Sequence, residues 1–234
     1  MRLAEQLEEF ADLPGMQVCR RTVLTPQKHT SLLHQEPDLT YAVLMPWIAS
    51  PTWMQVMFEG WILTSDEGLG LARALSEILA ELEQHGVAHC DLSAPNVLLP
   101  GMASKELWQG QQGSAGIALV DVEQLYDAGL RRPQLVPGGS PGYAHKSAPD
   151  GLWGLEADRF AGAILIAEML GWCDQDVRSA AWGENYFAPN EMQLDCDRYR
   201  QLAQVLRDRW GAETARLFER AWTSETLADC TTFG

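Results

Sequence analysis

The spacing of apolar residues predicts two long helices. In residues 65–85, apolar side chains recur every three or four positions, which is the period of one face of an α-helix. Ser65 is a favourable helix cap, the two acidic residues after it suit a first turn, and Gly86 ends the segment. Residues 156–170 are apolar on most sides, so we expect a second helix that is buried in the core.

Shorter patterns predict the remaining elements. Four runs rich in aliphatic and aromatic residues predict strands: residues 16–24, 39–48, 97–99 and 116–120. Short amphipathic helices are expected over residues 2–10 and over most of the chain after residue 170, and connectors over residues 25–38 and 110–116. Residues 125–143 are rich in Pro and Gly, and a long irregular segment of this kind is usually functional. A few strands followed mainly by helices indicate the α+β class.

Charge and cysteine content narrow the functions that fit. The 234 residues include 32 Asp and Glu against 17 Lys and Arg, which gives a net charge of −15. Such a field repels nucleic acids and anionic lipid surfaces, so we expect neither as a partner. No apolar run is long enough to span a bilayer, and the acidic N-terminus lacks the pattern of a signal peptide. The five cysteines include no C-x-x-C pair, so we expect free thiols and a cytoplasmic location.

The stretch most informative about chemistry is residues 89–99, which read His-Cys-Asp-Leu-Ser-Ala-Pro-Asn-Val-Leu-Leu. It is predicted to form a loop between the first long helix and a short strand. Asp91 on such a loop can orient an attacking hydroxyl and accept its proton. The amide oxygen of Asn96, five residues later, can hold a metal ion that neutralises triphosphate charge. The pattern therefore favours phosphoryl transfer.

This stretch resembles the catalytic loop of protein kinases, including the eukaryotic-like Ser/Thr kinase domains of bacteria. Four further segments resemble kinase elements in the expected order: residues 41–48 the strand and hinge that hold adenine, 118–123 the magnesium-binding D-F-G element, 139–143 the end of the activation segment, and 158–162 the start of a buried helix. The resemblance implies a protein kinase-like fold, with ATP and Mg²⁺ as cofactors. It divides the chain into a partial N-lobe, residues 1–46, and a mostly helical C-lobe, residues 47–234.

The resemblance also implies catalytic roles for individual residues. Asp91 would be the catalytic base, and Asn96 and Asp121 would be the magnesium ligands. Ser140 would brace Asp91. Ser93 lies in the catalytic loop where protein kinases often carry Lys, and a smaller residue there is common in small-molecule kinases.

Further residues would bind adenine or hold the loop. Met45 would be the gatekeeper beside the adenine, and Leu98 would form the floor of the pocket. The Pro46 carbonyl and the Ile48 N–H would bond the adenine edge; Pro suits this position because the residue only has to accept a hydrogen bond. Asp158, at the start of the buried helix, would hold the backbone of the catalytic loop.

Two parts of the kinase pattern are missing from this sequence. The glycine-rich loop and the phosphate-clamping Lys would precede the first helix, where the sequence begins. Glu5, with Glu8 or Glu9 as rivals, would be the helix carboxylate that pairs with this Lys. The resemblance therefore implies a truncated N-lobe, and we expect weak or absent phosphotransferase activity. Cys90 replaces the catalytic-loop Arg, so we expect no switch by phosphorylation of the activation segment.

Other interpretations remain open. The substrate would be a Ser/Thr hydroxyl of a protein or, alternatively, a small molecule. A pseudokinase-type module that binds a protein partner without catalysis is the main rival. Residues 138–142 also match the hydrolase pattern G-x-S-x-G, but Pro141 has no N–H to offer an oxyanion. His85 and His89 are four residues apart without a third ligand in register, so we do not expect a zinc site.

Overall fold

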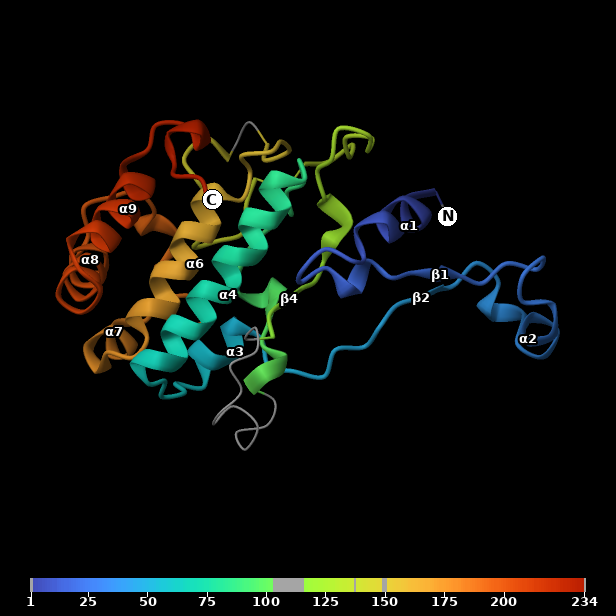
Figure 1. Cartoon of the computed structure of the whole chain (residues 1–234), viewed down its shortest axis with the longest axis horizontal. Helices are drawn as coiled ribbons and strands as arrows, with labels where there is room; N and C mark the ends of the chain where they lie inside the picture. The colour runs from blue at the N-terminus through green and yellow to red at the C-terminus, as the bar shows by residue number, and fades with distance from the viewer. Residues whose placement is uncertain (1, 103–115, 137, 149–150, 234) are drawn as a thin grey trace.

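The structure, a computed structural model, describes residues 2–102, 116–136, 138–148 and 151–233 (Figure 1). Within these ranges the chain forms eight α-helices and two small antiparallel sheets of two strands each, so it belongs broadly to the α+β class. The predicted connector at residues 110–116 lies almost wholly outside the described residues. No helix in the described ranges has the length and apolar character that a membrane span requires.

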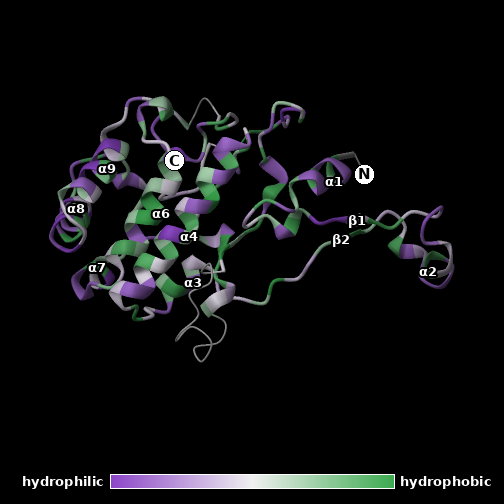
Figure 2. Cartoon of the chain, viewed as in Figure 1, coloured by the Kyte–Doolittle hydropathy of each residue, from purple (hydrophilic) through white to green (hydrophobic). Residues whose placement is uncertain are grey.

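Two long helices form the centre of the molecule. Helix α4 (Ser65–Gln84) and helix α6 (Arg159–Gly171), both predicted from their apolar patterns, pack against each other (Figure 1). Helices α8 (Asp197–Trp210) and α9 (Ala212–Thr223) pack on α6, with the short α7 (Gln175–Ala180) beside α8. Figure 2 shows hydrophobic stretches on α4 and α6 and hydrophilic residues along the outer helices α8 and α9. Such two-sided burial of α6 explains why its sequence is apolar nearly all round.

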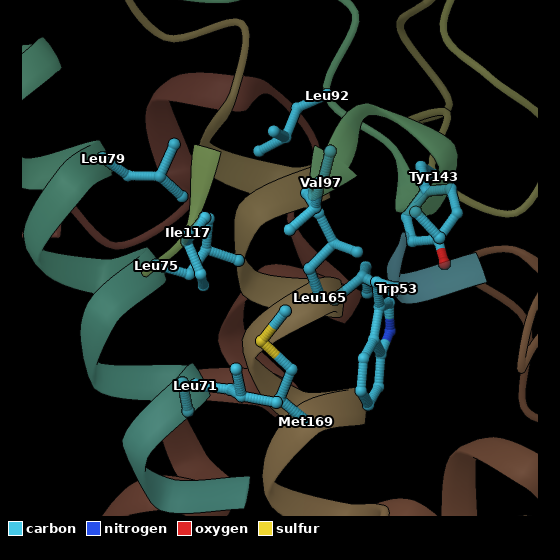
Figure 3. Close-up of a cluster of buried hydrophobic side chains, with 14 of the residues drawn as sticks. Trp53, Leu71, Leu75, Leu79, Leu92, Val97, Ile117, Tyr143, Leu165 and Met169 are labelled. Atoms are coloured by element: carbon cyan, nitrogen blue, oxygen red, sulfur yellow. The ribbon is translucent and has the colours of Figure 1, made fainter. Parts of the chain in front are cut away.

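The core joins both central helices to the loop that carries Asp91. Figure 3 shows side chains of α4, α6 and the strands converging, among them Leu75, Leu165 and Val97, all fully buried. Trp53, in helix α3 (Trp53–Phe58), is buried in the same cluster and meets Trp172 edge to face, with ring centroids 5.7 Å apart. The loop therefore rests on a packed base, which is what a site with fixed geometry needs.

The N-cap of helix α4 lies one residue before the predicted cap. Thr64, not Ser65, is the N-cap: its hydroxyl accepts the Glu67 N–H at 3.2 Å, and the Glu67 carboxylate accepts the Thr64 N–H at 2.7 Å. This reciprocal capping box pairs two backbone donors that the helix itself leaves free. The helix ends as predicted at Gly86, whose φ of 75° few other residues adopt.

The strands are much shorter than the sequence predicts. Strand β1 (Thr22–Val23) pairs with β2 (Val43–Leu44), and β3 (Val97–Leu98) pairs with β4 (Ala118–Leu119). Residues 17–19 form a 3-10 turn instead of a strand, because Val18 and Cys19 face the core without a neighbouring strand to pair with. The prediction of a plain connector at residues 25–38 is also wrong, since it contains helix α2 (Thr30–Gln35).

The N-terminal segment contacts the second sheet. Helix α1 (Arg2–Leu7), which continues as a 3-10 turn (Glu8–Phe10), agrees with the prediction of a helix over residues 2–10. The Leu119 N–H in β4 donates to the Gly15 carbonyl at 2.8 Å, which ties this segment to the body of the molecule. Beyond β1 the chain extends into an arm that carries α2 and returns through β2, away from the helices (Figure 1).

Candidate functional site

The predicted catalytic loop follows α4 and is hydrogen-bonded to the residue that precedes α6. Asp158, the residue just before α6, accepts hydrogen bonds from the backbone N–H groups of His89 at 2.5 Å and Cys90 at 2.9 Å. Cys90 has a φ of 65°, a conformation that non-glycine residues seldom adopt. A buried carboxylate that accepts both N–H groups offsets the cost of this bend. The backbone tie that the resemblance implied for Asp158 is therefore present.

His89 connects the loop to the strand that precedes Asp121. Its ring is fully buried, and its Nδ1 accepts the Asp91 N–H at 3.3 Å. The proton of the neutral ring must then sit on Nε2, which donates to the Val120 carbonyl at 2.8 Å. One imidazole thus fixes the backbone on both sides of the candidate site.

Three of the predicted catalytic residues lie together: Asp91 and Asn96 on this loop, and Ser140 on the segment of residues 139–143. The Asn96 amide Nδ2 donates to the Asp91 carbonyl at 2.8 Å, which leaves the amide oxygen of Asn96 as the atom that can accept or ligate. The Ser140 hydroxyl donates to Asp91 Oδ1 at 3.1 Å, although 49 residues separate them in sequence. The brace between Ser140 and Asp91 that the resemblance implied is therefore present.

Asp121 joins this group from the end of β4. The Val120 N–H donates to the Asn96 carbonyl at 3.0 Å, which holds the two loops side by side. Asp121 itself adopts a left-handed conformation with φ 62° and ψ 50°. Partial removal from solvent, a hydrogen bond and charge from Glu123, and the charge of Asp91 together raise the pKa of Asp121. Such an excess of negative charge favours a bound cation.

The donor set suits Mg²⁺ that is shared with a ligand. A carboxylate and an amide oxygen are the hard donors that Mg²⁺ prefers. In the described parts of the chain, no group of three or more His, Cys, Asp or Glu side chains is arranged to hold a metal ion by itself. Asn96 and Asp121 would therefore hold Mg²⁺ together with substrate phosphates and water, which is the usual way proteins bind this ion.

The predicted adenine-binding residues occupy two neighbouring segments. Met45 and Pro46 are exposed on the extended chain after β2, while Ile48 is half-buried. Leu98 in β3 is half-buried and forms an isolated bridge with Thr52. In the described residues, the Pro46 carbonyl and the Ile48 N–H have no backbone partner, so both can meet a ligand edge. Adenine contacts at these residues stay a prediction.

Ser93 has a different environment from the other loop residues. It is fully buried, and its hydroxyl oxygen has no hydrogen-bond partner in the described part of the chain. A buried hydroxyl without a partner is uncommon and marks a position that can gain one from a ligand or a movement of the loop.

Sequence reasoning missed a buried carboxyl under the turn that carries Ser140. Glu168 of α6 is fully buried, and its Oε2 accepts the Trp53 indole N–H and the Tyr143 hydroxyl, both at 3.0 Å. Burial raises the pKa of Glu168 to about 7, although these two hydrogen bonds oppose the shift. The Tyr143 N–H donates to the Ser140 carbonyl at 3.0 Å, so Glu168 anchors the turn that presents Ser140 to Asp91. A lone acid within an apolar helix was the available signal.

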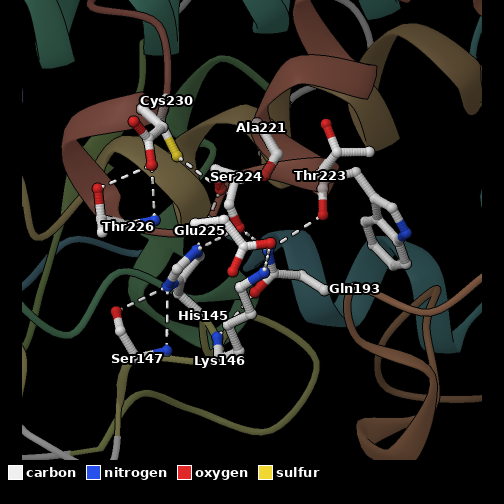
Figure 4. A network of polar contacts seen from close by, with 12 residues as sticks. His145, Lys146, Ser147, Gln193, Ala221, Thr223, Ser224, Glu225, Thr226 and Cys230 are labelled. Atoms are coloured by element: carbon white, nitrogen blue, oxygen red, sulfur yellow. Dashed lines mark hydrogen bonds and ion pairs between the residues drawn. The ribbon is translucent and has the colours of Figure 1, made fainter.

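The chain after this turn is anchored near the end of helix α9 by hydrogen bonds of His145 and an ion pair of Lys146 (Figure 4). The His145 Nδ1 accepts the Ser147 N–H at 3.1 Å, and its Nε2 donates to the Ser224 hydroxyl oxygen at 3.0 Å. Burial lowers the pKa of His145. Lys146 adds an ion pair with Glu225 at 2.7 Å at the surface. These contacts fix the far end of the segment that begins at Asp121.

The hydrolase interpretation of residues 138–142 gains no support from this geometry. A hydrolase nucleophile of this pattern lies between a strand and a helix. Ser140 has neither element directly beside it. Its hydroxyl donates to an aspartate instead of to a histidine base. Comparison with known proteins adds no name: no protein-family model matches the chain, and no curated protein matches it.

Proposed function

We propose that this chain is a protein kinase-like phosphotransferase that uses ATP and Mg²⁺ to phosphorylate a Ser/Thr hydroxyl. The observation that carries the proposal is the convergence of Asp91, Asn96 and Asp121 from two separate loops. Ser140 joins them through its hydrogen bond to Asp91 Oδ1. Phosphoryl transfer needs a hydroxyl-orienting carboxylate next to oxygen ligands for a cation, and these four residues supply that combination.

Each side chain has a distinct task in this proposal. The Ser140 hydroxyl occupies Oδ1 of Asp91, so the other carboxylate oxygen is available to orient the attacking hydroxyl and take its proton. Asn96 and Asp121 would hold Mg²⁺, which would neutralise charge on the phosphates. The Asn96 bond to the Asp91 carbonyl keeps base and metal ligand at a fixed separation.

We expect this activity to be weak. One preorganised donor or cation on the reacting group is typically worth roughly 3–4 kcal/mol, or about 10²–10³ in rate. The kinase pattern normally supplies a lysine and a glycine-rich loop in addition to the residues found here. Lys28 and Lys146, the lysines within the described residues, do not contact this site; Lys146 pairs with Glu225.

A binding module without catalysis is the second candidate. Apolar side chains on the arm and the chain after β2 are exposed, and Trp47 is 91% exposed. The group comprises Tyr41, Val43, Leu44, Met45 and Trp47. Contiguous exposed apolar residues often contact a partner. This observation favours a protein partner, which an active phosphotransferase could also have.

A thermal-shift titration separates the two candidates. ATP with Mg²⁺ is expected to raise the unfolding temperature more than ATP with EDTA, because Asp121 would help to hold the ion that neutralises phosphate charge. The matched variant Asp121→Asn should lose the metal-dependent part. Any ATP turnover should disappear in Asp91→Ala. A chain that gives no shift with millimolar ATP and Mg²⁺ would contradict the phosphotransferase and leave the binding module.

A further inference from the structure

An ion pair joins the N-terminal segment to the turn that carries Asp121. Arg21, next to β1, donates from Nη2 to Glu123 Oε1 at 2.7 Å. Its side chain is only 7% exposed, whereas the Glu123 side chain is 44% exposed. The Arg21 N–H donates to Glu8 Oε2 at 2.6 Å. Among the rival carboxylates of the first helical segment, Glu8 is thus the one that bonds Arg21, although Glu5, Glu8 and Glu9 are all exposed.

This guanidinium lies beside an excess of negative charge. Glu123 lies two residues after Asp121 in the same turn, and Asp121 feels the negative charge of both Glu123 and Asp91. Carboxylates this close repel each other, so the turn requires an opposing charge to stay in place. In the described part of the chain, Arg21 is the cation that contacts this acidic group.

The backbone at Asp121 also needs support. Its left-handed conformation is one that residues other than glycine adopt infrequently. The three residues after it form a 3-10 turn (Val122–Gln124), and Glu123 lies at the centre of that turn. Arg21 therefore holds the turn at Glu123, two residues after Asp121, from a segment about 100 residues earlier in sequence.

Stability alone does not explain why an arginine is buried here. Its Nε is buried without a hydrogen-bond partner among the described residues. A buried N–H without a partner is unfavourable, because its desolvation is not compensated. A residue kept for packing would not normally carry that penalty, and unsatisfied groups in native proteins concentrate where function requires them.

We propose that Arg21 is a positioning residue, which holds the turn from Asp121 to Gln124 through its ion pair with Glu123 and thereby sets the affinity of Asp121 for a metal ion. The second half of this statement rests on the proposed function. Arg21 of the N-terminal segment would then support the metal ligand Asp121, which is a different role from that of a lysine that clamps phosphates. Groups that hold a metal ligand in place typically change metal affinity by roughly 10- to 100-fold when they are removed.

Amide hydrogen exchange tests whether Arg21 keeps the turn from Asp121 to Gln124 in place. In Arg21→Met, amides of residues 119–125 are expected to exchange several-fold faster than in the wild-type chain, because the turn loses its anchor. Arg20→Met is the matched control: the adjacent Arg20 pairs with Asp12 at the surface, 61% exposed, so exchange in this turn should stay unchanged. Arg21→Lys retains the charge and should restore slow exchange. Equal exchange in wild type and Arg21→Met would overturn the proposal.

Mn²⁺ binding in the presence of ADP, followed by electron paramagnetic resonance, tests the consequence. Arg21→Met should weaken Mn²⁺ binding by roughly 10-fold or more, with near wild-type binding in Arg21→Lys. If Arg21→Met does not fold, the double variant Arg21→Glu with Glu123→Arg re-forms the ion pair with its charges exchanged. It should show slow hydrogen exchange in residues 119–125 and Mn²⁺ binding near the wild-type level. A folded double variant that lacks both would contradict the role proposed for Arg21. A wild-type chain that binds no Mn²⁺ would refute the proposed function, while the exchange data would still decide whether Arg21 holds the turn.

Discussion

At the scale of single residues, Glu168 makes the stability depend on pH. Burial raises its pKa from 4.5 to about 7 in the folded chain. Below about pH 4.5 the carboxyl is protonated in both states, and its favourable contribution is complete. Between pH 4.5 and 7 the unfolded chain ionises first, so the free energy of unfolding falls as pH rises. The loss is complete above pH 7 and amounts to about 3 kcal/mol.

The variant Glu168→Gln isolates this effect. The amide keeps the shape and an oxygen that can accept from Trp53 and Tyr143, but it does not ionise. Urea unfolding should therefore show wild type losing stability relative to Glu168→Gln between pH 5 and pH 8. The exposed Glu77→Gln in α4 serves as control and should leave the pH dependence of the wild type intact. Parallel curves for wild type and Glu168→Gln would refute the raised pKa.

At the scale of elements, the contact of α4 with α6 depends on a glycine. A Cβ at Gly68 in α4 would lie 2.6 Å from the backbone carbonyl oxygen of Met169 in α6, closer than atoms can pack. Because the obstacle is backbone, a side-chain rotation cannot relieve it. The two helices therefore approach as closely as they do because position 68 has no side chain.

Gly68→Ala is expected to destabilise the chain by about 1–3 kcal/mol, since overpacking costs outweigh the better helix propensity of alanine. Thermal or urea unfolding measures the change. Gly154→Ala is the matched control, because a Cβ there meets no atom within 4 Å. A Gly68→Ala variant as stable as Gly154→Ala would show that the helices can separate without cost.

The elements also show what a pattern can predict. Helices α4 and α6 were predicted because each is long enough for the 3.6-residue period to repeat. The strands were predicted in the correct places but too long, since a run of apolar residues does not reveal how many of them find a pairing partner. Helix α2 was missed because its single turn and a half carries only one buried residue, Leu33.

At the scale of the whole molecule, the candidate site was partly predictable from the order of segments. Asp91 and Asn96 are close in sequence, and the resemblance supplied Asp121 and Ser140 as their partners; the hydrogen bonds to Asp91 agree with this. Arg21 could not be predicted, because an arginine beside another arginine looks like an ordinary surface residue. Its burial follows from the way the N-terminal segment folds onto the Asp121 turn, which local sequence does not encode.

The arm beyond β1 has a consequence for the size of the particle in solution. A compact chain of 234 residues has a radius of gyration of about 17 Å, and the arm places α2 far from the centre of mass (Figure 1). Small-angle X-ray scattering should therefore give a radius above about 17 Å and a pair-distance distribution with a tail at long distances. Replacing residues 26–40 by a short glycine linker should remove that tail, whereas a symmetric distribution for the intact chain would mean that the arm folds back onto the helices.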